Sequence, residues 1–297
     1  MIHVVYETET ADPDDLLALA FLAHHPQLNL RSVIVTPGYQ PQVTIVMQAL
    51  RVLGKKVPIL VPTRPKNMTE NQKRGSVNPF WHNALEGLPD TYCDVPILYG
   101  TDCYQCTLAT GSVVITGCPP KGFWTFAEPN TARIPHWIAQ GGFAGTNIVE
   151  PQHVLPKFAG KVTCPTWNFG GAPKQVEKLL KLPSIDKITC VSKNVCHGVY
   201  YDHTAHKRLE PNQDKNLGLK LIYHAMDKYF LKYDHGKLMH DPLACTIAVD
   251  RSICEFKQVE VYREKGEWGA RPKEDSNTEI SVSVDLEKFW KTYFMES

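Results

Sequence analysis

Residues 2–24 read IHVVYETETADPDDLLALAFLAH, in which a strand-like apolar run passes through an acidic turn into an apolar helix. Ile2–Tyr6 has the β-branched and aromatic residues of a buried strand, and Asp14–His24 has the aliphatic run of a helix. A carboxylate cluster at the end of a first strand is typical of the carboxyl edge of an open α/β sheet, where such folds bind ligands. This stretch therefore predicts both the fold class and the position of a site.

The same alternation of strands and helices continues along the chain. Further strands are predicted at Leu30–Thr36, Val57–Val61, Ser112–Thr116, Trp137–Gly141, Lys187–Ser192 and Ile280–Val284, and further helices at Val43–Leu53, Lys174–Leu182, Leu217–Phe230, Pro242–Val249 and Leu286–Phe294. This rhythm predicts an α/β fold, in which a mostly parallel central sheet is flanked by helices in a Rossmann-like open arrangement. We expect residues 1–297 to form one domain. The interrupting stretches 62–100 and 193–216 are expected to be loops near the site.

The overall charge gives no reason to expect nucleic acid or an anionic membrane as a partner. Of 297 residues, 21% are charged, and the net charge is +1. No stretch approaches the roughly 20 apolar residues of a membrane span, and the N-terminus has no signal-peptide pattern. The nine cysteines are scattered and odd in number, which is typical of free thiols in the cytoplasm. We interpret Cys103–Cys106, a lone C-x-x-C, as part of a helix.

A second candidate cluster lies far downstream, in Met239-His240-Asp241-Pro242-Leu243-Ala244. Carboxylates and a histidine can bind a sugar, activate water and protonate a leaving group. Helix capping is the alternative interpretation of these carboxylates, because they stabilise helix starts. Crowding favours a site, since like charges repel unless a cation or a polyol balances them. The crowded residues are Glu7, Glu9, Asp12, Asp14 and Asp15.

These motifs resemble those of the nucleoside hydrolase family, of the inosine-uridine-preferring type. His240-Asp241-Pro242-Leu243-Ala244 matches the family's H-D-P-L-A without change, and Asp14-Asp15 matches the end of its D-x-D-P-G-x-D-D. Weaker matches follow in the family's order: Val35–Tyr39 for T-x-x-G-N, Cys118–Gly122 for G-P-L-T-N, Ala139–Phe143 for M-G-G, Thr166–Asn168 for E-F-N, and Val282–Trp290 for its closing segment. The resemblance spans nearly the whole chain. It implies a divergent member of the family that hydrolyses an N-glycosidic bond.

The resemblance also implies roles for individual residues. In the family a calcium ion chelates the ribose hydroxyls and the attacking water, and Asp15 and Asp241 would be its ligands in this chain. Asp14, or a glutamate from Glu7 and Glu9, would activate water, and His240 would stabilise or protonate the departing base. The predicted substrate-binding residues are Asn168, Asp12, Tyr39, Trp167, His82 and Lys121.

The chain departs from the family pattern at several of these positions. Without a gap the two leading aspartates of the motif become Thr8 and Thr10, and with one inserted residue they become Glu7 and Glu9. The family's asparagine after glycine is Tyr39, and its metal-binding threonine is Lys121. Calcium needs about six to eight oxygen ligands, and a nearby ammonium repels it. Two hypotheses follow: the Lys121 ammonium replaces the ion, or calcium still binds through the Lys121 carbonyl.

Three functions are compatible with these features. The first is release of a nucleobase from a nucleoside or related N-riboside or N-deoxyriboside. The second is a metal-independent DNA glycosylase, with aromatic residues at Phe80, Trp81, Tyr104, Trp124, Trp167 and Tyr201 and phosphate contacts from Lys55, Lys56, Arg64, Lys66, Lys73 and Arg74. The third is a non-catalytic nucleoside-binding protein. Family members are commonly dimers or tetramers, so the resemblance also implies a homo-oligomer.

Overall fold

A computed structural model describes residues 1–62, 76–91, 93–100, 111–128 and 133–296. Its main feature is an eleven-stranded sheet with the order β4-β3-β2-β1-β5-β6-β8-β13-β11-β12-β7. The parallel strands are β4 (Ile97–Tyr99), β3 (Ile59–Val61), β2 (Leu28–Val35), β1 (Ile2–Thr8), β5 (Val113–Thr116), β6 (His136–Gln140), β8 (Ile188–Val191) and β13 (Thr278–Val284). The antiparallel ones are β11 (Cys254–Glu264), β12 (Glu267–Pro272) and β7 (Thr163–Cys164). The predicted α/β fold with a mostly parallel sheet is confirmed.

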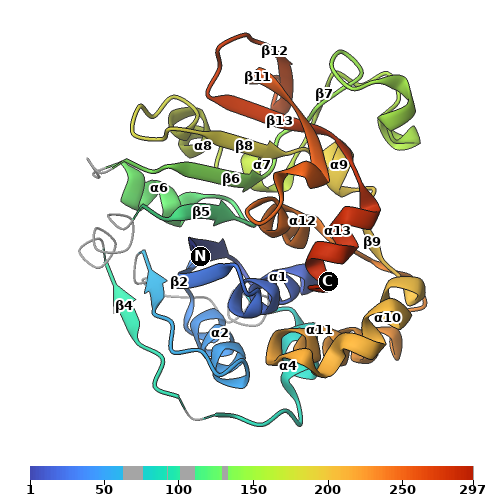
Figure 1. Ribbon diagram of the computed structural model, residues 1–297. Coiled ribbons are helices and arrows are strands. Elements are labelled where there is room, and N and C mark those ends of the chain that lie inside the picture. Colours follow the sequence, from blue (N-terminus) through green and yellow to red (C-terminus); the bar gives the residue numbers. More distant parts are fainter. Residues whose placement is uncertain (63–75, 92, 101–110, 129–132, 297) are drawn as a thin grey trace.

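Helices cover both faces of this sheet (Figure 1). They are α1 (Pro13–His24), α2 (Gln40–Val52), α4 (Pro79–Leu85), α6 (Lys121–Ala127), α7 (Trp167–Gly171), α8 (Pro173–Leu179), α9 (Lys193–Cys196), α10 (His203–Leu209), α11 (Leu217–Phe230), α12 (His240–Ile247) and α13 (Leu286–Tyr293). Each predicted helix that falls in the described residues is present, with ends that differ by a few residues. The stretch 193–216, expected to be a loop, instead forms α9, α10 and the short strand β9 (Tyr200–Tyr201), which pairs with β10 (Lys237–Leu238).

The alternation of side chains along β1 divides the core into two halves. Val4 and Tyr6 pack with α1 and α11 on one face, whereas Val5 packs with α6 and α8 on the other. Successive side chains in a strand point to opposite faces of the sheet. Thr8 therefore lies on the same face as Tyr6, and Glu7 lies on the same face as Val5. This alternation places Glu7, at the end of β1, on the face of the sheet opposite to Tyr6 and Thr8.

Helix α1 lies at the centre of the larger half of the core. Asp14 through Ala23 are all buried, because leucine and alanine occur on every side of the helix and neighbouring helices enclose it. It packs against α11 and α12, as Figure 1 shows. The Tyr293 hydroxyl of α13 donates a hydrogen bond to the Leu17 carbonyl at 3.1 Å and ties the C-terminal helix to α1. The start of α1 is therefore held rigidly at the carboxyl edge of the sheet.

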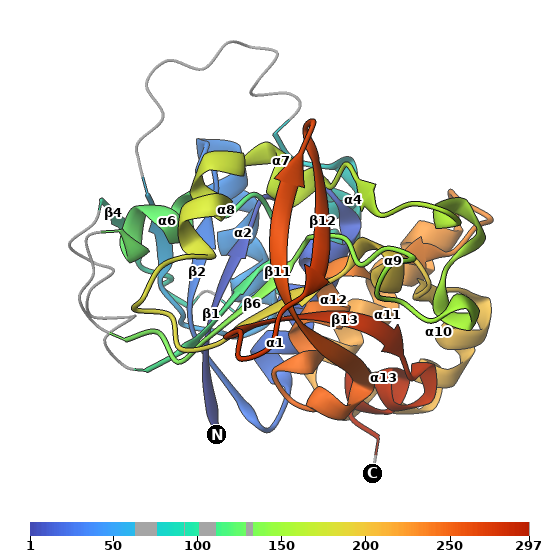
Figure 2. The same cartoon turned by 90° about the horizontal axis from the view of Figure 1, so that it is seen from above.

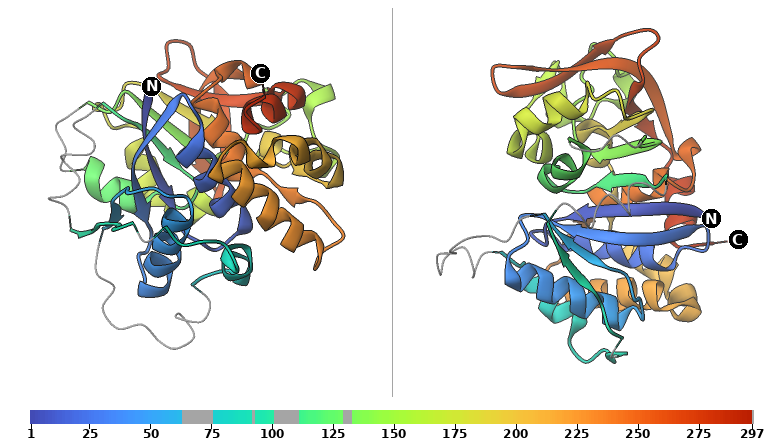
Figure 3. Two further views of the ribbon diagram at one scale, coloured as in Figure 1. Left: turned by 60° about the horizontal axis from the view of Figure 1, so that its bottom comes forward. Right: turned by 90° about the vertical axis from the view of Figure 1, so that its left-hand side faces the viewer.

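The hairpin β11–β12, which extends beside α7 in Figure 2, was not predicted from the sequence. Lys265 and Gly266 have φ values of 51° and 88°, which form its tight turn. The apolar alternation at Val259 and Val261 before a Lys-Gly pair was the available signal. Both chain ends lie on the same side of the molecule in Figure 2 and in the right-hand view of Figure 3. Within the described residues, no helix is long and apolar enough to cross a bilayer.

Leu19 tests the placement of α1, because it is fully buried in the middle of that helix. We expect Leu19→Ala to lower the free energy of unfolding by about 2–5 kcal/mol, through lost apolar contacts and the cavity left behind. Leu231 is 79% exposed, so Leu231→Ala should change it by less than about 0.5 kcal/mol. Denaturant unfolding measures both variants. Equal losses would contradict a central position for α1.

Candidate active site

A cavity of about 270 Å³ opens at the carboxyl ends of β1, β5 and β6. Its lining combines residues from the N-terminal acidic turn with residues from the downstream cluster, as the sequence predicted. The lining residues are Glu9, Ala11, Asp12, Asp14, Asp15, Gly117, Gln140, Trp167, Asn168, His240 and Asp241. Five of them are carboxylates, so this is a strongly acidic recess in a nearly neutral protein.

The turn between β1 and α1 is held by residues that the sequence motifs did not assign to the site. Thr10 has a φ of 71°, an unusual value for a β-branched residue, and its hydroxyl donates to the Ser76 carbonyl at 2.8 Å. The Gln42 side-chain amide donates to the Glu9 carbonyl. Buried Trp81 donates its indole N–H to the Asp12 carbonyl at 3.3 Å. These bonds hold the strained turn and direct Glu9 and Asp12 toward the cavity.

Asp15 and Asp241 form the buried floor of the cavity. Asp15 accepts from the Thr8 hydroxyl at 2.8 Å and from the Asp12 backbone N–H at 3.0 Å. Asp241 accepts from the Tyr6 hydroxyl at 3.0 Å, and a side chain at Gly117 would collide with it. Burial raises the pKa of both carboxyl groups well above the usual range, and the charge of Asp14 adds to the effect. Asp15 also caps α1, so capping and cavity lining coexist in one residue.

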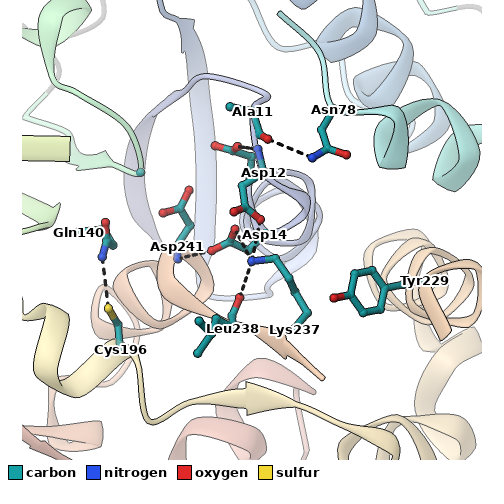
Figure 4. A network of polar contacts seen from close by, with 12 residues as sticks. Ala11, Asp12, Asp14, Asn78, Gln140, Cys196, Tyr229, Lys237, Leu238 and Asp241 are labelled. Carbon is teal, nitrogen blue, oxygen red and sulfur yellow. Dashed lines mark hydrogen bonds and ion pairs between the residues drawn. The ribbon is translucent and has the colours of Figure 1, made fainter. Parts of the chain in front are cut away.

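Lys237 is the cation of this acidic cluster. Its Nζ lies 2.6 Å from Asp12 Oδ1 and 3.2 Å from Asp14 Oδ1, and it donates to the Leu238 carbonyl at 3.1 Å (Figure 4). Asp14 is fixed from a second side, because its Oδ2 accepts the backbone N–H of Asp241 at 3.1 Å. Burial raises the pKa of Asp12 to about 6, with Asp14 contributing and Lys237 opposing. Burial alone would lower the pKa of Lys237, but the coulombic attraction of the two carboxylates outweighs this effect and raises the pKa.

Asn168 and Trp167 line the wall opposite the acidic turn. Asn168 is buried at the start of α7, and its amide nitrogen donates to Gly117 and Gln140 carbonyls, each at 3.0 Å. Trp167 is 76% exposed, yet its indole N–H donates to Glu9 Oε1 at 3.0 Å. Burial raises the pKa of Glu9, although the Trp167 bond opposes this shift. Both residues therefore line the cavity, with Trp167 bonded to Glu9, and their predicted roles in substrate binding stay predictions.

His240 opens α12 and lines the same cavity. Its Nε2 is buried and has no hydrogen-bond partner among the described residues. Burial lowers the pKa of His240 to about 4, and the charge on Lys237 contributes. The ring of His197 packs against it with centroids 4.7 Å apart. The imidazole is therefore neutral near pH 7, and it can offer a hydrogen bond more readily than a proton.

Glu7 lies on the opposite side of β1 from the cavity. Its carboxylate accepts from the Gly122 and Phe123 backbone N–H groups at 2.7 and 3.0 Å and from the Thr36 hydroxyl at 2.5 Å. It thereby caps α6, and burial raises its pKa to about 7. The alternation along β1 explains this placement, so Glu7 is excluded as the residue that activates water in the cavity. Neither alignment of the family's two leading aspartates accounts for both residues on the cavity side. These are Thr8, from the alignment without a gap, and Glu9, from the alignment with one inserted residue.

Three predicted substrate-binding residues lie outside the cavity lining. Tyr39 precedes α2, where its backbone N–H donates to Gln42, and His82 is exposed on α4. Lys121 is exposed at the start of α6 and forms no ion pair with Asp15 or Asp241 among the described residues, although its charge lowers the pKa of Glu9, so replacement of the ion by its ammonium stays a prediction. In the described part of the chain the cation on the acidic cluster is Lys237, which the family motifs did not reveal.

Among the described residues, Trp167 is the one predicted nucleic-acid contact that lines this cavity. Lys55 and Lys56 line a separate recess at the amino ends of β2 and β3, on the opposite edge of the sheet. Trp81 and Tyr201 are buried in the core. Phe80 lines a neighbouring cavity of about 310 Å³. Outside the described residues lie Arg64, Lys66, Lys73, Arg74, Cys103, Tyr104 and Cys106.

The donor atoms around Asp15 and Asp241 do not fit a calcium ion, which takes about six to eight oxygen ligands. The Lys121 carbonyl, the other expected ligand, belongs to α6 and accepts the Thr125 hydroxyl at 2.9 Å. Both oxygens of Asp14 are engaged, by Lys237 and by Asp241 N–H. Over the described ranges, no set of three or more His, Cys, Asp or Glu residues is arranged to hold a metal.

Comparison with solved structures identifies the fold. A plant nucleoside hydrolase superposes with a TM-score of 0.69 at 18% identity, covering 99% of this chain and 98% of that one. The chain has the nucleoside hydrolase fold. A purine-preferring ribonucleoside hydrolase from Gardnerella vaginalis gives 0.70 at 15% identity, with 99% and 97% coverage. The inosine-uridine-preferring nucleoside hydrolase from Bacillus anthracis gives 0.70 at 14%, with 100% and 99% coverage.

Sequence comparison is consistent with a divergent branch of this fold. No family model matches the chain. An uncharacterized protein from Aquifex aeolicus is 27% identical over 298 residues, which cover 96% of this chain and 94% of that protein. The resemblance stated from the motifs is thus confirmed at the level of the nucleoside hydrolase fold. The acidic cluster also contains residues that the family motifs do not include.

Glu7 provides a test of the two-sided arrangement of β1. Its folded-state pKa is raised from 4.5 to about 7, so the folded state holds the proton more tightly than the unfolded state. This contribution to stability is present below about pH 4.5 and is lost as the pH rises through about 7, with a limit near 3 kcal/mol. We expect the unfolding free energy of Glu7→Gln, relative to the unmodified protein, to increase over that window. A difference that does not vary with pH would contradict the buried position.

Proposed function

We propose that the chain hydrolyses the N-glycosidic bond of a nucleoside or a related N-riboside or N-deoxyriboside. One observation carries the proposal. On a nucleoside hydrolase fold, the N-terminal acidic turn and the His240-Asp241 cluster meet in one cavity with Asn168. Carboxylates on one side and a histidine on the other suit a reaction that passes through an oxocarbenium-like state.

Glu9 is the better candidate for activating water. Both carboxylate oxygens of Asp14 are already engaged, Oδ1 by the Lys237 ammonium and Oδ2 by the backbone N–H of Asp241, so neither is free to accept a proton from water. Glu9 has only the Trp167 indole as a side-chain donor within the described part of the protein, and burial raises its pKa. A carboxylate with a raised pKa takes a proton more readily from water in the transition state.

The remaining residues bind and orient. Asp14 and the Asn168 side chain face the cavity where sugar hydroxyls would lie, and Asp15 and Asp241 form the floor beneath them. His240 is neutral near pH 7 and supplies a hydrogen bond to the departing base. A bound base would also give its buried ring nitrogen the partner that the free protein lacks among described residues.

Separate substitution of Glu9 and of Glu7 distinguishes this assignment from the alternative, in which Glu7 activates water. We expect Glu9→Gln to lower kcat for base release by about 100-fold or more, because it removes the base. Glu7→Gln is the matched control, since Glu7 lies behind the sheet, and it should keep most of the activity below the pH at which it ionises. Chromatography of released base from ribonucleosides, deoxynucleosides and DNA measures both. A larger loss for Glu7→Gln would refute the roles assigned to the two glutamates.

The pH profile tests the charge states of the same groups. We expect kcat/KM to rise with pH above the ordinary glutamate range, as Glu9 and Asp12 ionise, Asp12 at about 6. No fall should follow near the usual histidine pKa, because His240 is already neutral above about 4. A bell-shaped profile whose falling limb disappears in His240→Ala would show that His240 acts as a proton donor instead. Tight nucleoside binding without release would favour a binding protein.

A further inference from the structure

The ammonium group of Lys237 has all three of its protons committed within the acidic cluster. Its acceptors are Asp12 Oδ1 at 2.6 Å, Asp14 Oδ1 at 3.2 Å and the Leu238 carbonyl at 3.1 Å. A lysine ammonium offers three donors and no acceptor, so this environment satisfies it completely. The side chain is only 10% exposed, and Figure 4 shows it between the two aspartates. A buried ammonium is tolerated only when it is paired in this way.

The backbone around Lys237 is also built to place it. Lys237 pairs with Tyr201 in the β9–β10 ribbon, and Met239, just beyond the ribbon, donates its N–H to the Val199 carbonyl at 3.0 Å. Gly236 lies so close to this ribbon that an added Cβ would come within 2.8 Å of the Tyr201 carbonyl. Lys237 therefore lies on β10, an element far from α1 in the sequence, and its side chain reaches the start of α1.

The position of the Lys237 ammonium affects whether a divalent metal ion can also bind at this site. Asp12 lines both the acidic cavity and the neighbouring cavity of about 310 Å³, and Lys237 lines only the latter. The ammonium thus contacts the carboxylates from behind and leaves the acidic cavity open to a ligand. A divalent ion added beside it would face a like charge at short range and a donor set that does not fit calcium.

We propose that Lys237 is the resident cation of this site and that the site needs no divalent metal. Lys237 acts as a positioning residue: it balances Asp12 and Asp14, orients both carboxylates and keeps the start of α1 in place. The inference deepens the proposed function, but it concerns the free protein, so metal binding and stability test it independently of turnover.

The test compares the unmodified protein with Lys237→Met, which keeps the length of the side chain and removes the charge. Lys232→Met is the matched control, because Lys232 is an exposed lysine on the wall of the neighbouring cavity. Each chelator-treated protein is titrated with calcium chloride in a calorimeter, and its Tm is measured in calcium and in EGTA. Lys237→Arg is included because it retains a cation.

We expect the unmodified protein and Lys232→Met to bind no stoichiometric calcium and to have the same Tm in both solutions. Lys237→Met should lose about 5 °C or more in EGTA, since the buried carboxylate of Asp14 and the half-exposed carboxylate of Asp12 lose their cation, and should regain part of it in calcium. Lys237→Arg should lose less. Stoichiometric calcium binding by the unmodified protein, or equal losses in Lys237→Met and Lys232→Met, would overturn the inference.

The activity arm separates failure of the inference from failure of the proposed function. Base release that persists in EGTA supports both the proposed function and the metal independence of the site. Base release that stops in EGTA and returns with calcium refutes metal independence alone. If no substrate is cleaved under any condition, the proposed function fails. The calcium titration of the unmodified protein then still decides the role of Lys237, even if Lys237→Met does not fold.

Discussion

The repulsion among carboxylates at one turn is the constraint on which this structure depends. Glu9, Asp12, Asp14 and Asp15 lie within a single turn, and Asp241 reaches the same cavity from α12. Like charges in a poorly solvated recess raise one another's pKa and oppose folding unless they are balanced. Lys237 balances Asp12 and Asp14, hydroxyl and backbone donors stabilise Asp15 and Asp241, and the Trp167 indole donates to Glu9.

The central sheet makes this arrangement possible by sorting the acidic residues. Side chains alternate along β1, so Thr8 and Tyr6 serve the floor of the cavity while Glu7 caps α6 on the opposite face. The strand ends at Thr8, so Glu9 is outside this alternation and lines the cavity instead; the two glutamates therefore have unrelated environments, and their raised pKa values have different consequences. Glu9 lines the cavity, where we propose that it activates water, whereas Glu7 caps α6 on the opposite face of the sheet.

The proposed role of Lys237 implies that a nucleoside hydrolase fold can carry a charge balance of its own. The overall superposition is close across the whole chain, yet the threonine position of the family is an exposed lysine at the start of α6. The compensating cation comes from β10, which is adjacent in sequence to the His240-Asp241 motif. Fold and charge balance are thus separable, because the sheet positions the cavity and a few side chains decide what it holds.

The sequence alone determined the fold class, most of the helices and parallel strands, and the pairing of the two acidic clusters. These follow from local periodicity and from motif order, which do not require knowledge of distant contacts. The three-dimensional structure decided the rest. It placed Glu7 behind the sheet, left Lys121 in solvent and brought Lys237 onto Asp12 and Asp14. The antiparallel β11–β12 hairpin was likewise revealed only by the three-dimensional structure. Each of these depends on strand register and on contacts between residues far apart in the chain, and a single sequence does not encode these in its local pattern.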